Sequence, residues 1–477
     1  MKLRFLHVVA IALWSASIQA GAAEEPDTIR EWTSVDGKKL IASFLGTKDG
    51  SVYLRLASGK TVPVPVTKLS DADQVFLSSH PVDYRPAWNG WTGDVSATPS
   101  ASAIRERSGG EGVYFYTTRR FQFETNANLG PLLTMDMGRL FELTYSLNSQ
   151  APLGIQSQPD GEFYQAKLCA TLNQYLNEGA PKGSAGYYDI RNRRFFAPLE
   201  LMGLTNGSAG WRKASQKDAD LTTVIHELTH MLTHDTLQVM PLWFSEGYAE
   251  YVSNVPLEGA AFKTGDKKMS ARLVELLVRE NDSSLVVPSS TGDIGYGGGG
   301  KSRKSDKTDP KDRIYQMRPV AGMLELPDAH WGKSQTSGYN STGTVMKFYR
   351  TAHLIVYYFY QIEGEVGARK VAAMLDRNKI AVAKLNAYQE EAKRYNAAME
   401  EFKRKPGVRQ LLDGRIEYPA SLTPPARPPD TPPVDPLRFK LEGVEALLGG
   451  ESAAVVGARI ERALQERLGV QIRFDIK

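Results

Sequence analysis

The segment that most restricts what this chain can fold into is His-Glu-Leu-Thr-His at residues 226–230. On an α-helix, His226 and His230 stand four residues apart and project from the same face. That spacing lets one Zn²⁺ ion take two nitrogen ligands from a single helix. Glu227 lies about 100° around the helix, where its carboxylate can reach a water molecule on the ion without binding the ion. The motif therefore indicates a metal site with an acid–base group beside it.

The residues around the motif have the pattern of a buried helix. Asp220 is the expected N-cap. Apolar residues follow on one face, at Leu221, Val224, Ile225, Leu228, Met231 and Leu232. The two histidines occupy the adjoining face. The alternative is a core helix whose histidines only form hydrogen bonds, but Glu227 would then be a buried charge without a purpose.

A catalytic zinc site takes three protein ligands and leaves one position open for water. The stretch Pro241–Tyr251 predicts a second helix that supplies the third ligand, and it begins with a proline, as helices often do. Glu246 and Glu250 share one face of it, and we assign Glu246 as the ligand. Glu250 is expected to accept the free N–H of a metal-bound histidine, with an exposed surface charge as the alternative. His234 lies two turns beyond His226, about 12 Å along the axis, too far to bind the same ion.

These two segments resemble the gluzincin metallopeptidases. The run Trp-Phe-Ser-Glu-Gly-Tyr-Ala-Glu-Tyr is similar to the Trp-x-x-Glu-Gly-x-Ala-Glu-Tyr pattern of aminopeptidase-like gluzincins and of secreted bacterial relatives. The resemblance extends over about 112–364 and is specific around the two helices. It implies a zincin-like lobe in which His226, His230 and Glu246 bind Zn²⁺. It also implies that Glu227 is the general base. The Gly-x-Met-x-Asn signature of exopeptidases is absent, so aminopeptidase activity is not implied.

Two further roles follow from this resemblance. In zincin folds, the edge strand beside the metal helix pairs with the extended substrate through main-chain hydrogen bonds. The strand with Gly186, Tyr187 and Tyr188 is expected to take that place, although an ordinary sheet strand is the alternative. Gluzincins also supply a tyrosine or histidine that stabilises the oxyanion from a later helix. Tyr349 and His353 are the candidates for this role, with aromatic core residues as the alternative.

The segment ahead of the motif predicts a sheet with helices. The expected elements are strands at Val113–Thr118, Arg120–Glu124 and Phe163–Ala170, a helix at Pro131–Ser149 and a hairpin within Ala185–Pro198. Beyond the motif, residues 343–362, 371–410 and 452–468 have helical patterns. The first of these is apolar most of the way round, which predicts a buried helix.

Residues 28–80 predict a separate small unit of short strands. Runs at Ile29–Thr33, Leu40–Leu45, Val52–Leu56 and Thr61–Val66 are separated by Asp-Gly and Ser-Gly pairs. Asp-Gly between alternating runs is a strong hairpin signal. Together with the following Lys-Leu-Ser-Asp-Ala-Asp-Gln run, these segments resemble the Sla-homology (SHD) domain, an SH3-like barrel that binds short peptides in its eukaryotic family. The resemblance implies a peptide, cell-wall or intramolecular ligand, or a role in folding alone.

The N-terminus has the pattern of a secretory signal over residues 1–22. Lys2 and Arg4 precede a short apolar core, and Ala-Gly-Ala at 20–22 offers a cleavage site. We therefore expect an exported protein, periplasmic or extracellular, without a transmembrane segment after cleavage. An uncleaved anchor is the alternative, although the apolar run is short for a membrane span.

Composition adds two restrictions. Cys169 is the one cysteine among 477 residues, so an intramolecular disulfide is impossible and a buried structural thiol is expected. The formal net charge of +4 gives no reason to expect nucleic acid as a partner.

The predicted fold class is α+β: a small all-β barrel, a zincin-like α/β catalytic lobe and a helical C-terminal domain. A linker rich in Pro, Gly and Ser occupies 81–111, the catalytic lobe 112–256 and the C-terminal domain 257–477. That last domain is expected to contain a mobile insert at 289–311 and a charged helical and Pro-rich insert at 385–436.

These features predict an exported zinc-dependent peptidase that hydrolyses a protein or peptide substrate with a metal-activated water. Two alternatives stay open. One is a secreted peptide- or cell-wall-binding protein with a structural or silent zinc site. The other is an amidase acting on peptidoglycan.

Overall fold

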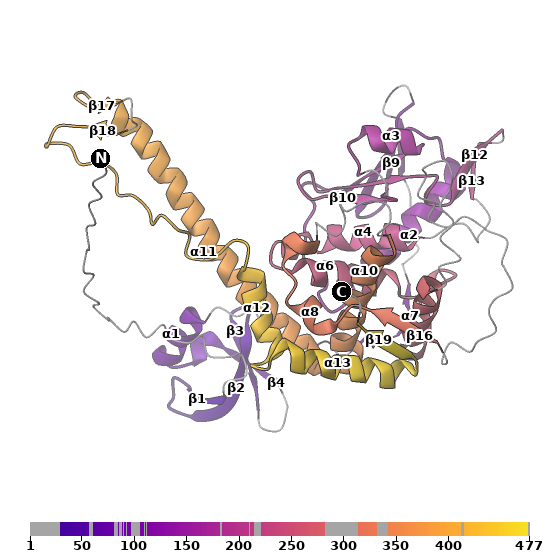
Figure 1. The fold of residues 1–477 in the computed structure, drawn as a ribbon, viewed down its shortest axis with the longest axis horizontal. Helices are drawn as coiled ribbons and strands as arrows, with labels where there is room; N and C mark the ends of the chain where they lie inside the picture. The colour runs from indigo at the N-terminus through magenta and orange to yellow at the C-terminus, as the bar shows by residue number, and fades with distance from the viewer. Residues whose placement is uncertain are drawn as a thin grey trace, which may run out of the picture. The chain divides into compact units, whose positions relative to one another are not determined.

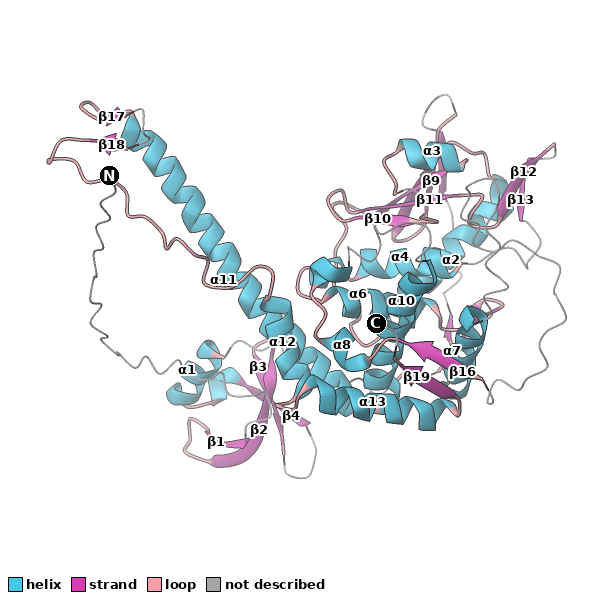
Figure 2. Ribbon diagram, viewed as in Figure 1, coloured by secondary structure: helices cyan, strands magenta, loops and turns pink. Residues whose placement is uncertain are grey.

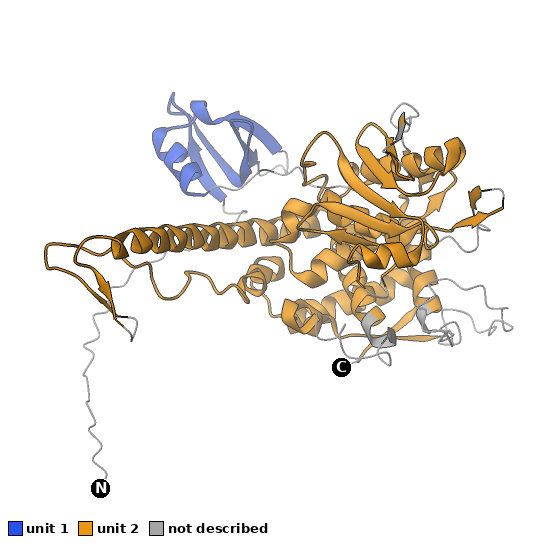
Figure 3. Cartoon of the chain, turned by 90° about the horizontal axis from the view of Figure 1, so that it is seen from above, with its two compact units in different colours: residues 1–86 blue, residues 87–477 orange. Residues whose placement is uncertain are grey.

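The computed structural model describes residues 29–56, 61–80, 84, 88, 90–91, 93–96, 105–108, 110, 112–181, 184–208, 210–213, 221–281, 313–331, 342–411 and 415–475. The chain divides into two compact units, residues 1–86 and 87–477 (Figure 3). The predicted signal at 1–22 and the insert at 289–311 lie outside the described residues, as does most of the linker. The N-cap of the helix that carries the motif is Leu221, without a side-chain cap, and not the expected Asp220. None of the helices within these ranges has the length and apolar character that crossing a membrane requires.

The first unit is a four-stranded antiparallel sheet followed by a helix. Its strands β1 (Ile29–Thr33), β2 (Lys39–Lys48), β3 (Ser51–Arg55) and β4 (Thr61–Pro65) pair in chain order, and a 3-10 turn, η1 (Val66–Lys68), leads to α1 (Asp71–Ser79) (Figure 1). The four predicted strands are thus present. Asp49 and Gly50 between β2 and β3 both have positive φ, as an Asp-Gly hairpin turn requires. The core of this unit is formed by Trp32, Ala42, Phe44, Val52, Leu54, Leu69 and Leu77.

Asp73 of α1 joins the helix to the sheet. Its carboxylate is 3% exposed and accepts from the Arg30 guanidinium at 2.6 Å, the Thr33 N–H at 2.8 Å and the Ser70 hydroxyl at 2.9 Å. Asp73→Ala leaves these donors without their acceptor, so we expect the unit to lose about 2–4 kcal/mol of stability. Faster amide exchange in β1 and β2 of the full chain would report the loss. Asp71→Ala, in the same turn but exposed, is the control, and equal protection in both variants would contradict the prediction.

The second unit is built on a six-stranded mixed sheet of order β10-β11-β9-β8-β7-β6. Its strands are β6 (Arg105–Ser108), β7 (Tyr114–Thr117), β8 (Phe121–Thr125), β9 (Tyr164–Cys169), β10 (Tyr187–Asp189) and β11 (Arg194–Pro198). Strand β9 runs parallel to both β8 and β11, and the other pairs are antiparallel. Strand β10 therefore forms one edge of the sheet.

Helices cover both faces of this sheet. On one face, α2 (Gly130–Gln150) and α4 (Thr222–Leu232) share a core with Phe195 and Tyr188. On the other, α3 (Leu172–Asn177) covers Cys169 and Phe196. Cys169 is 2% exposed and burial raises the pKa of its thiol to about 11, as expected of a structural cysteine.

Further helices surround α4, and among them α6, α8, α10 and α13 lie below it in Figure 2. They are α5 (His234–Leu237), α6 (Leu242–Ser253), α7 (Asp266–Asn281), α8 (Val320–Leu324), α10 (Thr342–Tyr357), the π-helix η5 (Tyr358–Ile362), α11 (Glu365–Lys403), α12 (Phe439–Leu448) and α13 (Ala453–Leu468). Short strands pair as β15 (Ala261–Phe262) with both β5 (Val95–Ser96) and β14 (Leu257–Glu258), β12 (Leu204–Gly207) with β13 (Gly210–Lys213), β16 (Ile314–Met317) with β19 (Gln471–Phe474), and β17 (Arg409–Gln410) with β18 (Ile416–Glu417).

The segments predicted as two domains, 112–256 and 257–477, fall within one compact unit. The reason is that α6 and α10, from either side of the predicted boundary, contribute to the same core. Helix α11 extends from this core into a projecting arm (Figure 1), and beyond Val382 its one buried residue is Phe402. The Pro-rich segment 419–436 contains no helix and returns along the arm, where its Pro429 carbonyl accepts from the Tyr388 hydroxyl at 2.9 Å.

Candidate functional site

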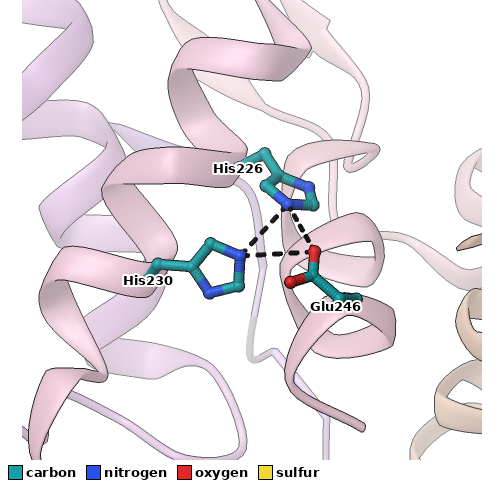
Figure 4. Close-up of side chains that lie close together, drawn as sticks. All are labelled: His226, His230 and Glu246. Carbon is teal, nitrogen blue, oxygen red and sulfur yellow. Dashed lines mark hydrogen bonds and ion pairs between the residues drawn. The ribbon is translucent and has the colours of Figure 1, made fainter. Parts of the chain in front are cut away.

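Helices α4 and α6 bring the three candidate metal ligands together (Figure 4). The Nε2 atom of His226 lies 3.1 Å from Nε2 of His230 and 3.2 Å from Oε2 of Glu246. The third separation, between His230 Nε2 and Glu246 Oε2, is 3.5 Å. Ligand atoms of a tetrahedral zinc site with bonds near 2.0–2.1 Å stand roughly 3.3 Å apart. Two imidazole nitrogens and one carboxylate oxygen thus have the identity and spacing that such an ion requires.

Helix α6 is held in place by close contact with α10. It begins after Pro241, and its first N–H, from Leu242, donates to Asp328 at 2.8 Å. An ideal Cβ on Gly247 would lie 2.5 Å from the carbonyl oxygen of Ala352, a distance that real Cβ atoms do not reach. Glycine after Glu246 is therefore what lets the two helices approach.

Gly247→Ala should separate α6 from α10. Overpacking of this kind costs about 1–3 kcal/mol, so we expect a lower thermal midpoint. Gly322→Ala is the matched control, because an ideal Cβ there has no atom within 4 Å and α8 should accept it. Thermal unfolding of both variants checks the prediction, and a Gly247→Ala protein as stable as the control would contradict it.

Glu250 lies behind His226, one helical turn after Glu246. Its Oε1 is 3.2 Å from Nδ1 of His226, and its Oε2 accepts from Arg350 at 3.4 Å and from Asn254 at 3.2 Å. Burial opposes ionisation of Glu250, but the His226 hydrogen bond and the Arg350 charge outweigh it and lower its pKa to about 2. A carboxylate on the second nitrogen of a ligating imidazole fixes the orientation of the ring. Glu250 is placed for that role and is not an exposed surface charge.

Glu227 points to the edge strand of the sheet. Its Oε2 accepts from the backbone N–H of Tyr188 at 2.9 Å, the one hydrogen bond found for this carboxylate in the described part of the chain. Burial raises the pKa of Glu227, and the charges of His226 and His230 oppose that rise. A raised carboxylate pKa suits a group that takes up a proton and later releases it.

Strand β10, predicted to pair with substrate, is the edge strand next to α4. Gly186 lies against the site, since an ideal Cβ there would be 3.5 Å from both Glu227 Cγ and Thr223 Cγ2. Tyr188 contacts Glu227 through its backbone. The Tyr187 side chain faces the other side of the sheet, where it stacks on Phe196 with ring centroids 5.4 Å apart, because successive side chains alternate along a strand.

The two oxyanion candidates on α10 have different surroundings. The ring of Tyr349 lies 6.3 Å from that of His226 and 5.2 Å from that of Trp331. His353 is buried, and its Nδ1 lies 2.9 Å from the Arg350 guanidinium that also donates to Glu250. Burial and the Arg350 charge lower the pKa of His353 to about 3. The structure therefore brings Tyr349, and not His353, beside the metal-ligand candidates.

Arg350 is the site residue that the sequence analysis missed. It is 3% exposed and connects Glu250 to His353. The available signal was a lone arginine on an otherwise apolar helix, because a buried guanidinium needs a buried carboxylate partner.

Comparison with known proteins identifies part of the chain. Residues 22–82 match the family model of SLA1 homology domain 1, SHD1. The first compact unit is therefore an SH3-like domain, which suggests that it binds a protein ligand. No curated protein and no solved structure matches the chain significantly.

Proposed function

We propose that this chain is an exported zinc-dependent peptidase. The observation that carries the proposal is the meeting of His226, His230 and Glu246 at separations of 3.1, 3.2 and 3.5 Å, with the carboxylate of Glu227 beside them. These three residues would hold the ion. When bound, Zn²⁺ supplies a Lewis acid that lowers the pKa of a water molecule and polarises a carbonyl group.

The chain's own residues have distinct tasks in this proposal. Glu227 takes a proton from the attacking water and passes it to the nitrogen of the leaving amine. Glu250, held by Arg350, keeps the ring of His226 in one orientation. Tyr349 is the candidate donor to the oxygen of the scissile carbonyl. Its hydroxyl would stabilise negative charge as that charge develops.

The edge position of β10 supports an extended peptide as the substrate. An open strand edge offers main-chain groups that an extended chain can pair with, whatever its side chains are. The N-terminal SH3-like domain supports a second candidate function, the binding of a protein ligand, which is compatible with peptidase activity. Export is proposed from the signal pattern at residues 1–22.

Metal analysis combined with a cleavage assay tests the proposal. We expect about one zinc per chain and cleavage of casein or a peptide library that stops with a chelator and returns with zinc. Zinc without any cleavage would favour the binding-protein alternative. Activity confined to purified sacculi would favour an amidase. Peptide cleavage by a metal-free protein would contradict the proposal.

A further inference from the structure

Tyr188 connects Glu227 to a histidine outside the metal-ligand group. Its backbone N–H donates to Oε2 of Glu227 at 2.9 Å. Its phenolic oxygen lies 2.8 Å from Nδ1 of His234, with the two rings perpendicular and their centroids 5.8 Å apart. The residue is 7% exposed. One tyrosine thus contacts the proposed general base with its main chain and a second helix with its side chain.

His234 is fixed with respect to the metal helix. It begins α5, and Thr233 alone separates it from the end of α4. The Thr233 hydroxyl donates to the Thr229 carbonyl at 2.7 Å, and the Thr233 carbonyl accepts from the Thr236 hydroxyl at 2.7 Å. Thr233 and Thr236 are each 1% exposed. These bonds fix the backbone that carries the His234 imidazole.

The protonation state of His234 allows its ring to accept a hydrogen bond. Burial lowers the pKa of His234, and the nearby Arg193 charge lowers it further, while Asp235 and Asp160 act in the opposite direction. In the tautomer of the neutral ring that presents Nδ1 as an acceptor, the Tyr188 hydroxyl donates.

Packing around the Tyr188 ring is incomplete on one side. A cavity of about 130 Å³ lies beside it, lined also by Tyr164, Met231 and Arg193. A ring next to free space loses contacts on that side and can shift into the space at little cost. A hydrogen bond between the ring hydroxyl and His234 opposes such a shift.

We propose that Tyr188 is a positioning residue for the general base: anchored on His234, it holds its N–H against Glu227 and so fixes the carboxylate that moves the proton. This role rests on the proposed function. The hydroxyl acts through Glu227 and touches neither the metal-ligand candidates nor the scissile bond. Small displacements of a catalytic group cost large factors in rate, so the anchor should affect kcat more than KM.

The test compares Tyr188→Phe, His234→Ala and His234→Gln with Tyr164→Phe. Tyr164 is a matched control, since it is also 7% exposed, lines the same cavity and donates its hydroxyl to the Ser157 carbonyl at 2.8 Å. We expect Tyr188→Phe and His234→Ala each to lower kcat about 10- to 100-fold, with a smaller change in KM and unchanged zinc content. The double variant should be no worse than either single one, because both remove the same bond. His234→Gln should recover part of the rate, since its amide oxygen accepts a hydrogen bond.

Amide exchange of the β10 peptide gives a readout that does not need turnover. Tyr188→Phe and His234→Ala should speed exchange of the residue 188 amide, whereas Tyr164→Phe should not. Unchanged exchange, wild-type kcat in Tyr188→Phe, or losses that add in the double variant would overturn the proposal. Faster exchange in a protein that cleaves no peptide would instead reject the proposed function and keep the structural link between His234, Tyr188 and Glu227.

Discussion

Replacing Glu227 by glutamine is expected to abolish peptide hydrolysis while leaving zinc bound. Glutamine keeps the size of the side chain, and its amide oxygen can still accept from the Tyr188 N–H at the position where the carboxylate accepts at 2.9 Å. It cannot take up a proton. General acid–base catalysis contributes about 10²- to 10⁴-fold, so kcat/KM should fall by that factor. Steady-state kinetics measure kcat/KM, and zinc analysis of the same preparation measures the zinc content.

A matched control for this variant is Glu466→Gln, the same change at an exposed position of α13. It should keep the wild-type rate and zinc content. A Glu227→Gln protein as active as this control would show that another group accepts the proton. Loss of zinc from Glu227→Gln would show that Glu227 supports the metal, which the proposed mechanism excludes.

The second large effect is expected at Glu246. Burial opposes its ionisation, but the charges of His230 and His226 and their hydrogen bonds hold the pKa of Glu246 below its usual range. Its Oε2 lies 3.2 Å from Nε2 of His226 and 3.5 Å from Nε2 of His230, where a third ligand is needed. Glu246→Ala leaves two imidazoles, and we expect zinc affinity to fall by more than the roughly 10- to 100-fold that loss of an outer partner causes. Competition with a chromogenic chelator measures the change.

Glu250→Gln provides the comparison, because it alters the adjacent carboxylate on the same helix face. It should weaken zinc binding by about 10- to 100-fold, through His226 alone. If Glu246→Ala retained zinc as well as the wild type did, the third ligand would lie elsewhere. If Glu250→Gln bound zinc more weakly than Glu246→Ala did, Glu250 would be the metal ligand and Glu246 the outer partner.

The candidate site was largely predictable because its geometry is local. Four residues make about one helical turn, so the spacing of His226 and His230 fixed their common face before any tertiary contact was known. The same spacing put Glu246 and Glu250 on one face of α6. Only the convergence of the two helices was an assumption, and the structure shows their side chains 3.2 to 3.5 Å apart.

Other features depended on tertiary packing that no local pattern encodes. Helix α10 is apolar most of the way round, so its sequence did not say which of Tyr349 and His353 faces the site. The contact between His234 and Tyr188 joins residues 46 positions apart, and the contact between Tyr188 and Glu227 joins residues 39 positions apart. Predicting them would have required knowing that β10 is an edge strand beside α4. Chain order likewise does not show that α6 and α10, on either side of the expected boundary at 256, share a core.

In the N-terminal unit, by contrast, local signals were enough to predict the strands. Their Asp-Gly turns and alternating residues are local signals, and β1 at Ile29–Thr33 has the predicted bounds. The end of the chain behaves in the same way: Ser452 caps α13 and Gly469, with φ 63°, ends it where the pattern predicted.

The central claim is that two imidazoles and one carboxylate hold a single zinc ion, and anomalous diffraction at the zinc edge from crystals of the zinc-loaded full chain tests it most directly. The account predicts one strong peak about 2.0–2.2 Å from His226 Nε2, His230 Nε2 and a carboxylate oxygen of Glu246. A zinc-loaded crystal with no peak between these three side chains, or with its peak elsewhere on the chain, would contradict it.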